Sequence, residues 1–104
     1  MINKDLIEEI IANGRIIWQK HALQRIFERN ISRDSVLKAV LKGEIIKNYI
    51  DDKPFSSYLM AYNDNVKIIH AVVSFDIENK ICYIITAYYP DADHFEKDMI
   101  TRKK

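Results

Sequence analysis

Hydrophobic residues recur at helical spacing through the first 43 residues of the chain. They predict three helices, over residues 3–14, 19–29 and 32–43, with Asn3 and Ser32 as N-caps and a glycine at the end of the first and third. The first helix has the apolar residues Leu6, Ile7, Ile10 and Ile11. The second has Ala22, Leu23, Ile26 and Phe27, and the third has Val36, Leu37, Val40 and Leu41.

After Gly43 the pattern changes to short runs of β-branched and aromatic residues. These runs predict four strands, over residues 44–50, 56–62, 66–75 and 81–89, and their short connections predict antiparallel neighbours. The last two strands are apolar on both faces, so we expect them in the middle of the sheet. Beyond Pro90, Asp93 and Glu96 have the spacing of a capping box and predict a short C-terminal helix. The expected fold is α+β: N-terminal helices packed on a four-stranded antiparallel sheet, with a short C-terminal helix.

The composition is that of one ordinary domain. The chain has 104 residues, of which 48% are hydrophobic and 30% charged, so we expect a single domain over residues 1–104. No apolar run approaches the roughly 18 residues that span a bilayer, and the first residues turn acidic at once, so we expect a cytoplasmic protein without a membrane partner. A single cysteine, Cys82, and three scattered histidines offer no metal-ligand spacing, so we expect no metal and no cofactor.

Charge is distributed unevenly along the chain. The net charge is +1, but residues 15–47 carry +5, residues 48–101 carry −5, and the last three residues, Arg102, Lys103 and Lys104, add +3. A basic helical face and a basic tail on an acidic body favour binding of a polyanion at one place. The alternative is a set of solvated helix faces without a ligand.

The second predicted helix carries the most informative group of polar residues. His21, Arg25 and Arg29 follow one another at intervals of four residues, which places them in one ridge beside the apolar stripe. Two guanidinium groups bind phosphate oxygens, and a histidine transfers protons near neutral pH. The alternative is structural: Arg25 forms a surface ion pair with Glu28, and His21 fills a gap at the edge of the core.

Three further candidates lie on the predicted strands. His70 lies within the most apolar strand, and Tyr88 and Tyr89 point to opposite faces just before Pro90. A tyrosine at a strand end can stack on a base or orient a phosphate. A buried, hydrogen-bonded histidine and cross-strand packing of tyrosines are the alternatives. Cys82 is expected to be a small core residue.

The chain resembles a known family. The stretch from Trp18 to Ser32, with its His-Ala-x-x-Arg signature, then Val36, residues 43–46 and Tyr49, is similar to the small bacterial and archaeal domains of domain-of-unknown-function family 4258. Residues 69–72, 85–91 and 102–103 fit the same pattern. The resemblance implies a fold similar to the RelE and BrnT toxins and covers nearly the whole chain after Gly14.

The resemblance also implies a function. It implies a toxin of a type II toxin–antitoxin pair, acting as a metal-independent RNA endonuclease (an mRNA interferase) on free or ribosome-bound RNA, with a cognate antitoxin of the zinc-finger type. His21, Arg25, Arg29 and Tyr88 are then the expected catalytic residues, and the expected substrate-binding residues are His70, Tyr89, Arg102 and Lys103. An antitoxin would cover the ridge or add to an open sheet edge, at residues 44–50 or 56–62. The alternative is a non-catalytic nucleic-acid-binding or protein-binding regulatory module.

Overall fold

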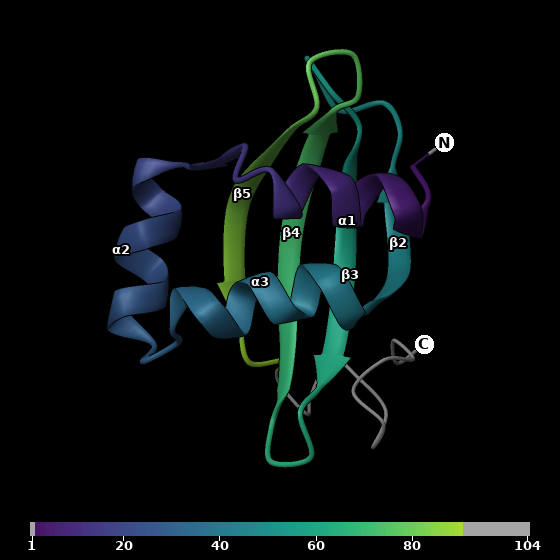
Figure 1. Cartoon of the computed structure of the whole chain (residues 1–104). Helices are drawn as coiled ribbons and strands as arrows, with labels where there is room; N and C mark the ends of the chain where they lie inside the picture. Colours follow the sequence, from purple (N-terminus) through teal and green to yellow (C-terminus); the bar gives the residue numbers. More distant parts are fainter. Residues whose placement is uncertain (1, 91–104) are drawn as a thin grey trace.

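The computed structural model describes residues 2–90, which form three helices and five strands (Figure 1). The helices are α1 (Lys4–Ala12), α2 (Lys20–Glu28) and α3 (Arg33–Lys42). The strands are β1 (Ile16–Trp18), β2 (Glu44–Tyr49), β3 (Ser57–Asn63), β4 (Ile68–Asp76) and β5 (Ile81–Tyr88). All three predicted N-terminal helices and all four predicted strands are present, whereas β1 was not predicted. The expected C-terminal helix lies outside the described residues.

All five strands belong to one sheet, in the order β1-β5-β4-β3-β2. The neighbours from β2 to β5 are antiparallel, as predicted, and β4 and β5 are interior strands. β1 instead pairs parallel with β5, with Ile16 opposite Cys82 and Trp18 opposite Ile84. The prediction of a four-stranded, wholly antiparallel sheet is therefore wrong: the sheet is five-stranded and mixed. Parallel pairing needs a long connection, and here most of the domain lies between β1 and β5.

Two helices, α1 and α3, cross one face of this sheet (Figure 1). The sheet residues beneath them are buried and apolar, and include Met60, Ile69, Ala71, Val73 and Ile84. Both helices begin at the predicted N-caps. The Leu6 backbone N–H donates to Asn3 Oδ1 at 2.9 Å, and the Ser35 N–H donates to Ser32 Oγ at 3.0 Å.

The third helix, α2, lies beside β5 rather than over the sheet (Figure 1). Ala22 and Ile26 are buried against the core and Leu23 is partly buried, as the apolar stripe predicts. Phe27, predicted in the same stripe, is 84% exposed. A helix at the margin of the sheet buries a narrower stripe than one packed across its face, which accounts for the difference. None of the helices between residues 2 and 90 is long and apolar enough to cross a membrane.

Candidate functional site

The position of α2 depends on the shortness of β1. β1 ends at Trp18, and its ladder with β5 closes where the Gln19 N–H donates to the Ile84 carbonyl at 3.2 Å. The chain then turns into α2, which runs along the rest of β5 in the direction of that strand (Figure 1). The outer edge of β5 beyond Ile84 is therefore flanked by a helix, which cannot continue the strand ladder.

Arg29, at the C-terminal end of α2, bonds to this edge. Its Nη1 donates to the Ala87 carbonyl oxygen at 2.9 Å and lies 3.5 Å from the Thr86 hydroxyl oxygen. The guanidinium thus supplies a donor to a strand carbonyl that β1 does not reach. Arginine has five N–H donors, so others remain for a ligand.

All three residues of the ridge are exposed, Arg29 included. We call His21, Arg25 and Arg29 the α2 ridge. Arg25 Nη1 lies 3.8 Å from Glu28 Oε2, with side chains 56% and 47% exposed, so the predicted ion pair forms but is weak. His21 is exposed, and no other residue between 2 and 90 forms a hydrogen bond or ion pair with it. The rise of an α-helix separates His21 from Arg29 by about 12 Å, so the ridge spans neighbouring nucleotides rather than one phosphate.

His70 and Tyr88 lie together on the sheet face that α1 and α3 do not cover. They are direct partners in the β4–β5 ladder, and their rings meet edge to face with centroids 5.5 Å apart. Ala71 and Val73 point into the core beneath the helices, so alternation along β4 places His70 and Val72 on the opposite, outer face of the sheet. Tyr88 is partly buried, but His70 is fully buried. The His70 side chain is therefore not exposed to solvent, and its role in substrate binding stays a prediction.

Tyr89 faces the other way, as strand alternation predicts. It packs against the core, and Lys67 Nζ lies 4.5 Å from the centre of its ring. Tyr89 and Lys67 line an open hollow of about 600 Å³ beside the β3–β4 turn. Arg102 and Lys103, the last two predicted substrate-binding residues, lie outside the described residues.

Cys82 is buried in the core, as predicted. Burial raises the pKa of its thiol to about 12, so the sulfur stays protonated at neutral pH. A protonated, inaccessible thiol is not a nucleophile.

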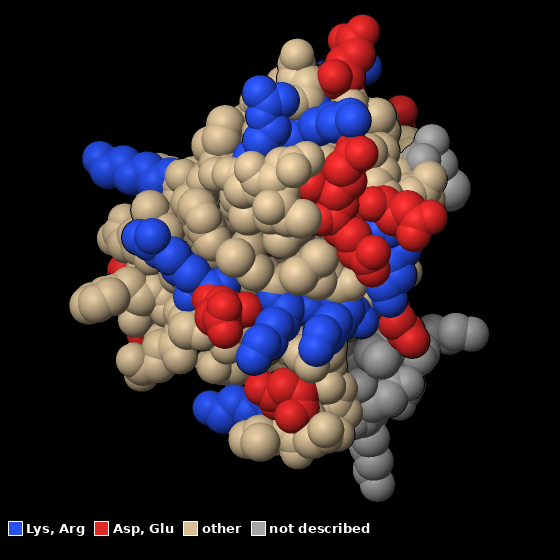
Figure 2. Space-filling view, viewed as in Figure 1, with Lys and Arg blue, Asp and Glu red and all other residues tan. Residues whose placement is uncertain are grey.

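The uneven charge of the sequence is visible on the surface. On the face shown in Figure 2, basic side chains gather mainly over α2 and α3, while a cluster of acidic side chains covers α1. Lys38 on α3 pairs with Asp34 at 3.7 Å, an exposed and therefore weak contact. The helices thus present a basic side next to the α2 ridge.

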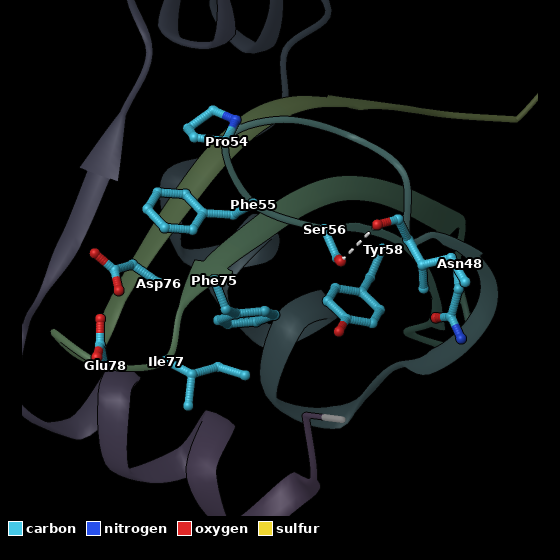
Figure 3. A pocket seen from close by; sticks show the side chains of 10 residues that line it. Asn48, Pro54, Phe55, Ser56, Tyr58, Phe75, Asp76, Ile77 and Glu78 are labelled. Atoms are coloured by element: carbon cyan, nitrogen blue, oxygen red, sulfur yellow. Dashed lines mark hydrogen bonds between the residues drawn. The ribbon is translucent and has the colours of Figure 1, made fainter.

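Sequence reasoning missed a second hollow, at the opposite end of the sheet (Figure 3). It lies between the β2–β3 loop and the β4–β5 turn and has a volume of about 550 Å³. It includes the side chains of Tyr58, Phe75, Asp76, Ile77 and Glu78. These residues are distant in sequence, and turn composition alone gave no signal that they meet.

The fold and the site together define an α+β domain with a mixed sheet and a basic, partly anchored helix along one margin. The chain belongs to the family described as a domain of unknown function, DUF4258, whose sequence model matches residues 18–89. The match confirms the family expected from the His-Ala-x-x-Arg signature. No curated protein and no solved structure matches the chain, so the expected likeness to the RelE and BrnT fold gains no support.

Proposed function

We propose that this protein binds single-stranded RNA along the α2 ridge and cleaves it, as the toxin of a toxin–antitoxin pair. The observation that carries the proposal is the ridge: His21 and Arg25 are exposed on the side of α2 on which Arg29 is anchored to the Ala87 carbonyl. Exposed guanidinium groups on one helix face bind consecutive phosphates, and the basic side of the helices steers a polyanion toward them.

Cleavage without a metal ion needs two proton transfers and a cation. A base takes the proton of the ribose 2′-hydroxyl, the 2′-oxygen bonds to phosphorus, and the bond to the 5′-oxygen breaks as an acid protonates it. The products are a 2′,3′-cyclic phosphate and a 5′-hydroxyl end. In this proposal His21 transfers a proton, Arg25 and Arg29 stabilise charge on the phosphate, and Tyr88 orients the strand.

Binding without cleavage is the second candidate, and one observation favours it. His70 is fully buried, so His21 is the exposed histidine of the site within residues 2–90. General acid–base cleavage uses two proton-transfer groups, and the other exposed groups of the ridge are arginines, which stay charged. A ridge with a single titrating group suits a phosphate-binding surface.

Product analysis on the purified full chain separates the two candidates. The substrate is an end-labelled single-stranded RNA, and the variants are Arg25→Ala and His21→Ala, with the exposed Lys4→Ala on α1, outside the basic side of the helices, as the matched control. Under the cleavage proposal each ridge variant loses about 100-fold in rate, the size expected for a lost transition-state contact, and the control keeps the wild-type rate. Salt-sensitive binding without new RNA ends would establish the binding module instead. Neither binding nor cleavage would refute both.

We further propose that a cognate antitoxin, encoded beside this chain, covers the α2 ridge. An acidic segment would be steered to the basic side of the helices, so the complex should weaken as salt rises. The test is co-purification with neighbouring gene products, repeated with Arg25→Glu. Reversing this exposed charge should abolish co-purification; unchanged binding would place the antitoxin elsewhere.

A further inference from the structure

The hollow at the far end of the sheet has walls of two kinds (Figure 3). Its inner wall is aromatic: the ring centroids of Tyr58 and Phe75 lie 5.8 Å apart, and Phe55, which also lines the hollow, stacks on Tyr83 outside it with ring centroids 5.7 Å apart. Its rim carries Ile77, which is 45% exposed. Such walls accept an aliphatic or aromatic group and shield it from water.

The polar side chains that line the hollow carry either a negative charge or no charge. Asp76 is 7% exposed and accepts two hydrogen bonds from Asn79, at 3.1 Å from the backbone N–H and 2.8 Å from the side-chain amide. Glu78 lies beside Asp76 in Figure 3 and forms no hydrogen bond or ion pair with another residue in the range 2–90. Of the residues between 2 and 90, no lysine or arginine lines the hollow, and Lys80, two residues after Glu78, pairs with Glu9 at 2.8 Å.

The Tyr58 hydroxyl is a second feature of the hollow that indicates a ligand. Its side chain is more than nine-tenths buried, at 6% exposure, and it lines the hollow. Within the described part of the chain no residue hydrogen-bonds to its hydroxyl. A phenol that lines the hollow and has no hydrogen-bonding partner among residues 2–90 is a group that a ligand can satisfy.

The hollow also adjoins a sheet edge. β2 pairs with β3 on one side, and no strand between residues 2 and 90 pairs with its other side. Asn48, near the end of β2, and Ile50, just after it, both line the hollow. An extended segment that adds to β2 would therefore carry its alternate side chains to the mouth of the hollow.

We propose that this hollow binds an arginine or lysine side chain presented by an extended segment of a partner protein that pairs with β2. The methylene stem packs against Phe75 and Ile77 and the charged end meets Glu78, while the Tyr58 hydroxyl, on the other side of Phe75 in Figure 3, hydrogen-bonds to the backbone of the segment. The site lies at the opposite end of the sheet from Tyr88, so it does not depend on the RNA proposal.

Peptide titration of the isotope-labelled full chain tests the proposal by nuclear magnetic resonance. The probe is acetyl-Thr-Val-Arg-Val-Thr-amide, and two matched peptides carry norleucine or glutamate in place of the arginine. We expect the arginine peptide to shift the amide signals of Asn48, Ile50, Ile77 and Glu78 with a Kd on the order of 0.1–1 mM, and about tenfold tighter than the norleucine peptide. The glutamate peptide should not bind.

Variants of the lining residues test which side chains bind the peptide. Glu78→Gln should weaken the arginine peptide about fivefold and Tyr58→Phe about threefold, the size of one exposed ion pair and one hydrogen bond. Asp34→Asn, a matched loss of charge on α3, should leave affinity unchanged. Both site variants keep side-chain shape, and their dispersed spectra report that they are folded.

Three results would overturn the proposal. The first is equal binding of the arginine and norleucine peptides, which would make the hollow merely apolar. The second is the absence of shifts at the hollow up to about 5 mM peptide, beyond the range of weak specific docking. The third is binding of arginine amide alone as tightly as the peptide, which would show a small-cation site without strand pairing. RNA binding is scored separately, by shifts on α2.

Discussion

Removing the Arg29 side chain should destabilise the fold, whereas removing that of Arg25 should not. Arg29→Ala takes away the donor that lies 2.9 Å from the Ala87 carbonyl oxygen. A hydrogen bond from a charged donor contributes about 1.5–3 kcal/mol, and because this bond is partly exposed, water replaces some of it. We therefore expect a loss of about 1–2 kcal/mol, which lowers the Tm of a domain of this size by about 5–10 °C.

Arg25→Ala is the matched control on the same helix. Its ion pair with Glu28 is long, at 3.8 Å, and both side chains are about half exposed, so its removal should cost at most about 0.5 kcal/mol. Urea unfolding followed by circular dichroism and by Trp18 fluorescence measures both variants. Arg29→Lys, which keeps one donor, should fall between wild type and Arg29→Ala. Equal stability of the two alanine variants would refute the anchoring role of Arg29.

The same unfolding assay checks three other expectations. A Cβ at Gly43 would overlap the Ala39 carbonyl oxygen and lie 2.8 Å from that of Ala61, so Gly43→Ala should cost about 2–3 kcal/mol. Gly14, at φ +70°, has open space around it, so Gly14→Ala should cost only the left-handed backbone penalty of about 1 kcal/mol; a larger loss than at Gly43 would contradict this contrast. Burial raises the pKa of the Cys82 thiol to about 12, against about 8.5 in the unfolded chain. The protonated thiol therefore contributes fully to the stability of the fold below pH ~8.5, and the free energy of unfolding falls by up to about 2 kcal/mol as the pH rises to ~10. Cys82→Ala should lack that part of the pH dependence, and the native thiol should resist disulfide reagents until the chain unfolds.

Sequence patterns predicted the helices and strands that are marked by local features of their own residues. The caps Asn3 and Ser32 and the β-branched runs of β2 to β5 are local features, and the structure confirms them. β1 has no such signal, because three residues are too few for alternation to show. It becomes a strand only because β5, over sixty residues later, offers an edge. Short connections predict antiparallel pairing only between strands that follow one another in sequence, so they gave no indication that β1 pairs with β5.

The two arginines of the α2 ridge illustrate the same limit at the site. The spacing of Arg25 and Arg29 predicted that they share one ridge, but it also predicted the same phosphate-binding role for both. What separates them is the length of β1, which ends opposite Ile84 and leaves the Ala87 carbonyl of β5 to a side chain. A longer β1 would occupy that edge and leave Arg29 without its bond to the strand, like Arg25. The shortness of one strand therefore divides the ridge into a cation anchored to β5 at the end of α2 and one that is not, and a phosphate bound between them would meet one partner held by the sheet and one held only by its ion pair with Glu28.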